Sequence, residues 1–167
     1  MNGSRLPFRE GFPSHLENSK SILFSKDSEF IMRYQQKDFT NELKIRIQET
    51  ELALKEHCET LLRENKSIFE NKNLEFDAGF DIDGSNHFQP GYCSTIAIGI
   101  SDKTVTHGEL IDLHQIKIWE CQRTILGQSI SKNIPGSKVV GDFLDESLEE
   151  IQEELKEYIE DFLSEEI

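Results

Sequence analysis

The sequence lacks a long apolar run. Its longest apolar-like stretch, TIAIGI at 95–100, is far shorter than the roughly 18 residues that a membrane-spanning helix needs. The first fifteen residues, MNGSRLPFREGFPSH, also lack the apolar segment that a secretory signal carries. We therefore expect a cytoplasmic protein with no membrane partner.

Cysteine and basic residues are scarce. Cys58, Cys93 and Cys121 are widely spaced and form no CxxC pair, which argues against a disulfide framework and a zinc knuckle. Only 18 lysines and arginines stand against 32 aspartates and glutamates, so the net charge is −14. Such a field repels nucleic acid and speeds the encounter with a basic protein. We expect a basic protein partner and no nucleic acid.

The chain nevertheless contains enough apolar residues to fold. With 167 residues, 36% of them hydrophobic, it is predicted to form a single domain over 1–167. An N-terminal segment over 1–37 includes a capping-box pattern, SHLE, at 14–17. Apolar residues three, four or seven positions apart predict a central helix over 39–70 and an acidic C-terminal helix over 142–165.

Alternating residues between the two helices predict antiparallel strands over 74–130. The clearest are LEFDAGFDID, STIAIGIS and HQIKIWECQ, and a weaker fourth strand lies near RTILGQSI. Strands clustered between helices, without strict βαβ alternation, indicate the α+β class. We expect an antiparallel sheet of three to four strands, one face of which is covered by the central helix and the acidic C-terminal helix.

The first of these strands is apolar on one face and anionic on the other. Its even positions, from Leu74 to Ile82, predict a face packed against the helices. The open face then carries Glu75, Asp77, Asp81 and Asp83. We expect these carboxylates to bind the partner.

The end of this strand resembles a phosphatase motif. DIDGSN at 81–86 is similar to the DxDG[TS] loop of haloacid-dehalogenase-type phosphatases, and the resemblance implies Asp81 as nucleophile and Asp83 as general acid/base. It departs from that family because the preceding residues alternate, whereas a buried parallel strand is continuously apolar. We interpret the motif as an acidic hairpin turn in which Gly84 takes a positive φ.

Histidines and cysteines form no recognised ligand pattern. His87 and Cys93 fall in one loop region and His107 and His114 in the next, and the sequence leaves open whether they converge on a metal. We expect no cofactor, no metal and no catalytic residue. A small metal-dependent or hydrolytic enzyme that uses the loop from Asp81 to Cys93 is an alternative.

The single tryptophan is a candidate interface anchor. Alternation places Trp119 and Lys117 opposite Ile116 and Ile118, on the same face as the acidic row. Aromatic residues contribute much of the energy in binding hot spots, so we expect both residues to contact the partner. The alternative is that the N-terminal segment covers Trp119 and buries it in a second small core.

The C-terminal end is strongly acidic, with twelve carboxylates and one lysine between 142 and 166. We expect Glu149, Glu150, Glu153 and Glu157 to steer a basic partner over long range, the alternative being a solvated helix face. The sequence therefore predicts an acidic binding protein, best matched by an immunity protein or inhibitor that blocks a nuclease-type toxin by occlusion. A scaffold or adaptor subunit that assembles through the C-terminal helix, including as a homo-oligomer, is the other alternative.

Overall fold

The computed structural model describes residues 31–165, and Met32–Ile167 form one compact unit. The capping box expected at 14–17 and most of segment 1–37 lie outside the described residues, so a single domain over 1–167 stays a prediction. The elements in chain order are β1 (Ile31–Gln35), the 3-10 helix η2 (Gln36–Asp38), α3 (Asn41–Glu70), β2 (Leu74–Asp83), β3 (Cys93–Asp102), β4 (Glu109–Ile125), β5 (Gln128–Ile130), β6 (Lys138–Leu144) and α4 (Leu148–Glu165).

The strands form one sheet in the order β1-β6-β4-β3-β2, and β5 pairs with the end of β4. Antiparallel pairing joins β2 to β3, β3 to β4, and β4 to both β5 and β6. The predicted α+β class is confirmed, but residues 31–165 form a sheet of six strands rather than three to four. The sequence did not predict β1 or β6. β1 is too short to show a clear alternation, and the apolar residue at the end of β6 shares a helical spacing with the residues that follow it.

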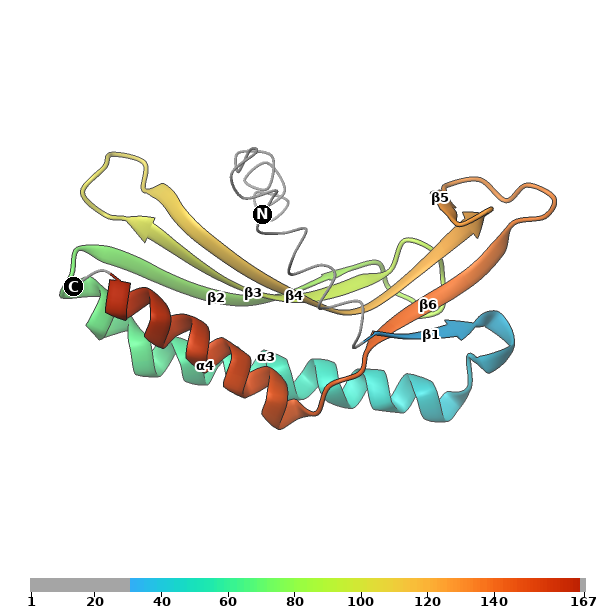
Figure 1. The fold of residues 1–167 in the computed structure, drawn as a ribbon, viewed down its shortest axis with the longest axis horizontal. Coiled ribbons are helices and arrows are strands. Elements are labelled where there is room, and N and C mark those ends of the chain that lie inside the picture. Colours follow the sequence, from blue (N-terminus) through green and yellow to red (C-terminus); the bar gives the residue numbers. More distant parts are fainter. Residues whose placement is uncertain (1–30, 166–167) are drawn as a thin grey trace. The chain divides into compact units, whose positions relative to one another are not determined.

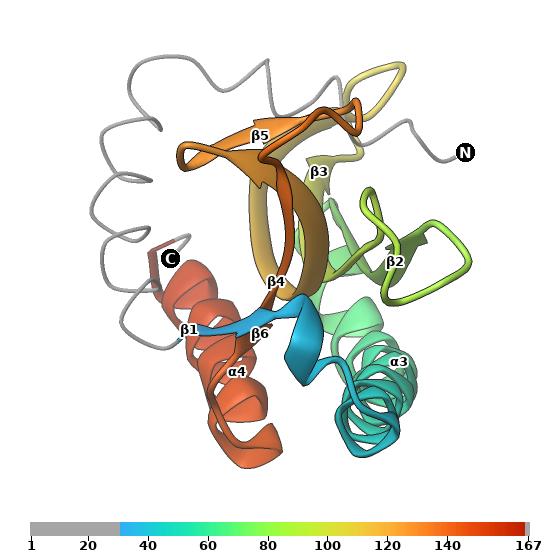
Figure 2. The ribbon, with the colours of Figure 1, turned by 90° about the vertical axis from the view of Figure 1, so that its right-hand side faces the viewer.

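Both helices cover the same face of the sheet (Figures 1 and 2). The predicted central helix is confirmed as α3, whose N-cap Thr40 accepts a hydrogen bond from the Leu43 backbone at 3.1 Å. It ends before Asn73, which has a φ of 59°, a backbone conformation that asparagine tolerates better than most residues.

The C-terminal helix begins at Leu148, so the expected start at 142 is wrong. Leu144 belongs to β6, although its spacing also continues the apolar stripe of the helix. The helix begins where a capping box forms: Glu150 N–H donates to Ser147 Oγ at 3.1 Å, and Ser147 N–H donates to Glu150 Oε1 at 2.7 Å.

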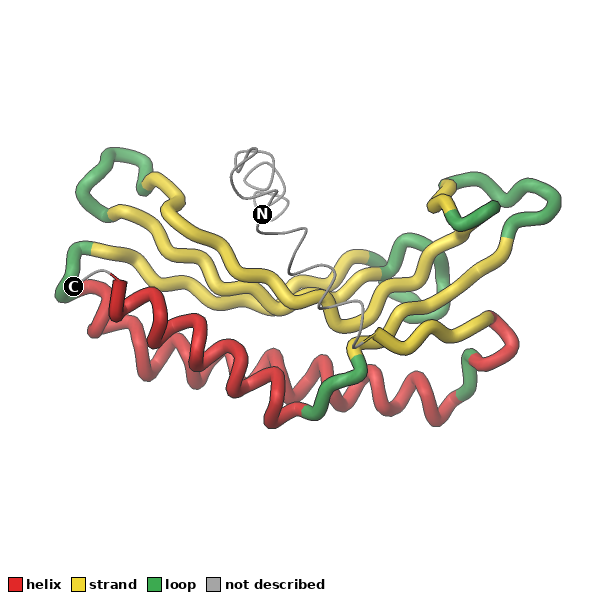
Figure 3. The backbone as a smooth tube through the Cα atoms, in the orientation of Figure 1, coloured by secondary structure: helices red, strands yellow, loops and turns green. Residues whose placement is uncertain are grey.

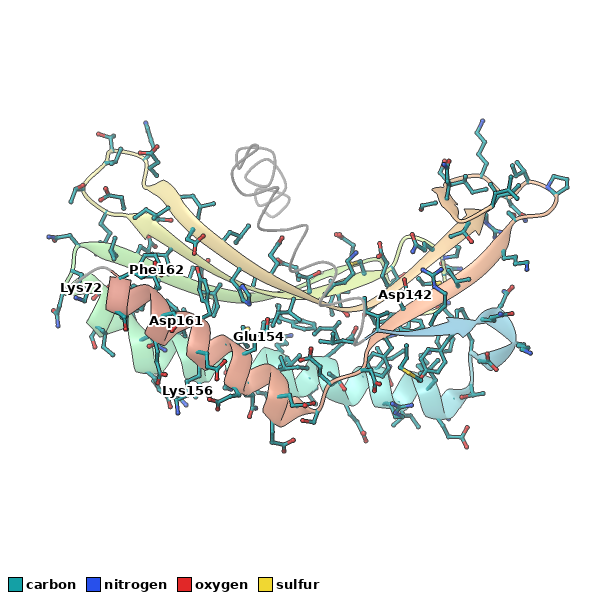
Figure 4. All side chains as sticks on the ribbon, viewed as in Figure 1. Lys72, Asp142, Glu154, Lys156, Asp161 and Phe162 are labelled. Atoms are coloured by element: carbon teal, nitrogen blue, oxygen red, sulfur yellow. The ribbon has the colours of Figure 1, made fainter. Side chains whose placement is uncertain are left out.

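The core lies between the sheet and the two helices, which form separate layers in Figure 3. Ile96, Ile98 and Ile100 of β3 are fully buried there, beneath α3 and α4. On α4, Phe162 lies on the side that faces the sheet and Lys156 on the side that faces away (Figure 4). The apolar stripe of α4 is therefore part of the core.

Candidate partner-binding surface

The acidic row occupies the open face of β2, as predicted from the alternation. Leu74, Phe76 and Ala78 are buried, and Phe80 is partly buried against the core. The prediction for Ile82 is wrong, because at the end of the strand its exposed fraction is 49%. The carboxylates of the row point to the opposite face, and all of them are exposed: Glu75, Asp77, Asp81 and Asp83. Because β2 is the last strand of the sheet, the row follows an edge.

Small residues of β3 lie beside the row. The register opposes Glu75 to Ser101, Asp77 to Gly99, Asp81 to Thr95 and Asp83 to Cys93. No register shift interrupts this ladder, so all four carboxylates lie on the same face of the strand. In the middle, Gly79 opposes Ala97, and the row is divided there into two pairs of carboxylates.

Lys117 of β4 also reaches the open face, because it opposes Thr95. Its Nζ donates to Glu120 Oε1 at 2.7 Å. Lys117 is thus exposed on the same side of the sheet as the acidic row, with its charge paired to a neighbour on its own strand.

Trp119 does not lie on the open face, and the prediction of an exposed anchor is wrong. The register between β3 and β4 shifts by one residue, so that Thr95 opposes Lys117 and Ser94 opposes Trp119. The extra residue, Ile118, forms a β-bulge that turns Trp119 toward the helices. Its exposed fraction is 0%.

Described residues on the helix side bury the Trp119 indole. The ring centroids of Phe39, Phe88 and Phe143 lie 5.8–6.1 Å from that of Trp119, and all three pairs are edge-on. The indole Nε1–H donates to the His87 carbonyl at 2.7 Å, which satisfies its one donor. Trp119 therefore holds the loop after β2 onto the core.

A buried polar cluster lies under the same loop and was missed in the sequence. Glu51 lies on α3 among its apolar residues, and its exposed fraction is 6%. Its carboxylate oxygens are 2.8 Å from His87 Nε2 and 2.8 Å from the Tyr92 hydroxyl, which donates to Oε2. Burial, helped by this hydrogen bond, raises the pKa of Tyr92 above its usual range. The available signal was the position of Glu51 on the apolar stripe between Ile47 and Leu54.

The histidines and cysteines with metal-binding potential are kept apart. His87 contacts Glu51, whereas His114 Nε2 lies 3.0 Å from Glu154 Oε2 of α4. Cys93 lies on the open face opposite Asp83, and His107 is an exposed loop residue. Within residues 31–165 no group of three His, Cys, Asp or Glu side chains is placed to hold a metal ion.

The thiols of Cys93 and Cys121 are partly or fully buried, as is typical of cysteines that serve packing. Burial raises the pKa of Cys93 and raises the pKa of Cys121 to about 11. A thiol must lose its proton to act as a nucleophile, so both are poorly suited to that role at neutral pH.

The DIDGSN segment ends an antiparallel edge strand and not the buried parallel strand that the resemblance to phosphatases implies.

The α4 carboxylates form a separate surface. Glu149, Glu150, Glu153 and Glu157 are exposed on the helical layer, on the side of the sheet away from the acidic row. Glu150 also caps the helix. The structure therefore presents two anionic surfaces that face different directions.

Comparisons of the chain with protein-family models, curated proteins and solved structures found no match. No helix within residues 31–165 is long and apolar enough to cross a membrane.

Proposed function

We propose that this chain is a non-enzymatic binding protein that captures a basic protein on the open face of β2. The observation that carries the proposal is the row of four exposed carboxylates in unbroken register on one strand. Alternate residues of a strand are roughly 6.8 Å apart, so the two carboxylates within each pair are separated by about that distance. A rigid array of this kind suits arginine, whose planar guanidinium pairs with carboxylates in a defined geometry.

A nuclease-type toxin is the partner class that fits this chemistry. Its substrate site is cationic because it binds phosphates, and carboxylates can take the place of the phosphate oxygens. The chain would then act as an immunity protein or inhibitor that excludes nucleic acid by occlusion. In this proposal, the stem of a basic side chain lies over Gly79, between the two carboxylate pairs.

The α4 carboxylates take a different part in this proposal. They add to the net charge of −14 and so raise the rate of encounter with a cationic protein. Because they lie on the helical layer, they do not contact the partner that occupies the open face. Their removal should slow association more than it speeds dissociation.

The test compares two variants that remove equal charge from different surfaces. E75Q/D77N/D81N removes three charges from the acidic row, and E149Q/E153Q/E157Q removes three from α4. Tagged wild type and both variants are used to capture proteins from the native cell at low and high salt, and captured proteins are identified by mass spectrometry. The captured protein is then purified and tested for nuclease activity with each variant.

We expect the wild type and the α4 variant to retain one basic protein stoichiometrically and to inhibit its nuclease activity. The acidic-row variant should retain less of it and inhibit poorly. Equal retention by the acidic-row variant contradicts a site on β2, and the absence of any stoichiometric basic partner at either salt contradicts the proposed function.

A further inference from the structure

The turn between β4 and β5 holds an exposed leucine in a strained backbone. Ile125 pairs with Gln128, so Leu126 and Gly127 form a two-residue turn, with φ values of 50° and 81°. Turns of this type favour Asn-Gly, because a bulky side chain is disfavoured at positive φ. The exposed fraction of Leu126 is 97%, so its side chain adds almost nothing to the core. Strain without a packing benefit suggests that the side chain serves an interaction.

The leucine stands on an ordered, basic protrusion. Arg123 Nη1 donates to Asn133 Oδ1 at 3.1 Å and to Ser137 Oγ at 3.2 Å, which ties β4 to the loop before β6. Residues 121–141 contain Arg123, Lys132 and Lys138 and no acidic residue, in a chain of net charge −14. We call residues 123–138 the basic tip.

The outer face of α3 has the complementary properties. Ile45 and Leu52 are seven residues apart on the side of the helix opposite its buried residues, with exposed fractions of 43% and 58%. Glu49 and Glu56 are exposed and follow them at the helical spacing of four. We call these four residues the outer stripe. It faces away from the sheet, whereas the basic tip lies on the other side of the sheet, so the two surfaces cannot meet in one molecule (Figures 1 and 2).

We propose that the basic tip of one molecule docks on the outer stripe of a second copy. Leu126 packs between Ile45 and Leu52, and the basic side chains of the tip pair with Glu49 and Glu56. Two outer stripes do not pair with each other, because their glutamates repel. The contact is heterologous, so each molecule retains one unused surface and the assembly grows head to tail. Neither surface includes the acidic row, so this inference does not depend on the proposed function.

The test is sedimentation velocity of the full chain from about 10 μM to about 1 mM, a range that covers weak association. At low salt we expect the average mass to rise with concentration beyond that of a dimer. At about 0.5 M NaCl it should fall toward that of a monomer, because salt screens the charge pairs.

Two substitutions separate association from folding. L126N removes the apolar contact and should weaken association about tenfold or more, while asparagine accepts the positive φ and leaves the fold intact. L52Q should weaken association to a similar degree, since glutamine is a good helix former. V105N, which changes another exposed apolar residue outside both surfaces, is the matched control and should associate like the wild type.

A mixture of L126N and L52Q gives the sharpest result. L126N keeps its outer stripe and L52Q keeps its basic tip, so one complete interface forms and the mixture should yield dimers and nothing larger. A wild type that remains monomeric at about 1 mM overturns the proposal. So does association that survives L126N and L52Q, or a mixture in which no dimer appears.

Discussion

At the scale of single residues, Trp119 packs directly on Gly141. A Cβ atom on Gly141 would overlap Trp119 Cη2 and would lie within 2.8 Å of two further ring carbons. In the ladder between β4 and β6, Gly141 pairs with Cys121, two residues away from the pair that Trp119 forms with Phe143. The indole therefore lies directly over the glycine backbone, and this position requires glycine for space and not for a turn.

We expect G141A to lower the free energy of unfolding by about 3 kcal/mol, because the methyl group displaces the Trp119 ring and disturbs the aromatic cluster. Urea denaturation followed by tryptophan fluorescence measures the change. G99A is the matched control: its Cβ would meet Leu110 Cδ1 at 3.7 Å, an ordinary contact, so stability should change by less than about 1 kcal/mol. Equal effects of the two substitutions would contradict this account of the Trp119 site.

At the scale of elements, α4 is held to β4 by polar contacts as well as by its apolar stripe. The Tyr158 hydroxyl donates to Asp112 Oδ2 at 2.7 Å, and the His114 ring stacks on the Tyr158 ring with centroids 4.6 Å apart. Burial raises the pKa of Tyr158, and the hydrogen bond to Asp112 raises it further. In an unfolded chain tyrosine has a pKa of about 10.

This difference predicts a loss of stability in alkali. Above pH 10 the unfolded chain releases the Tyr158 proton while the folded chain retains it, so the free energy of unfolding falls as the pH rises. We expect this residue to account for a loss of about 2 kcal/mol between pH 10 and pH 11.5. Urea denaturation of wild type and Y158F across this range measures it, and Y158F should show the shallower decline. Parallel pH profiles would show that Tyr158 does not hold its proton in the fold.

At the scale of the whole molecule, the charged side chains of residues 31–165 are gathered into separate surfaces. The acidic row occupies the open face of the sheet, the α4 carboxylates occupy the helical layer, and the basic tip extends from the end of β4. Within α4, Glu149, Glu153 and Glu157 repeat at intervals of four and repel one another.

This repulsion predicts a salt effect on stability. E149Q/E153Q/E157Q should raise the free energy of unfolding by about 0.4–1 kcal/mol at low salt, because two like-charge pairs are removed. The gain should disappear at about 1 M NaCl, where screening weakens the repulsion in the wild type. Thermal or urea unfolding at both salt concentrations provides the measurement. A gain that is independent of salt would indicate helix propensity and not charge as its cause.

The sequence by itself determined the features that depend on neighbours along the chain. The alternation in β2 predicted both of its faces from Leu74 to Phe80, because no bulge interrupts the ladder with β3, but Ile82 at its end is exposed. The apolar spacing of α3 predicted a long helix packed on one side, and the clustering of strands predicted the α+β class. That the acidic row binds a partner stays a prediction.

Only the tertiary structure decided the features that depend on distant parts of the chain. Trp119 faces the core because pairing with β3 accommodates Ile118 as a bulge, and no local pattern marks that extra residue. Glu51 is buried because His87 and Tyr92, 36 and 41 residues away, supply its hydrogen bonds. Leu144 could continue a strand or a helix by its spacing, and in the folded chain it is the last residue of β6. Periodicity is a property of adjacent residues, whereas burial of a polar or aromatic group depends on the partners that the completed fold brings to it.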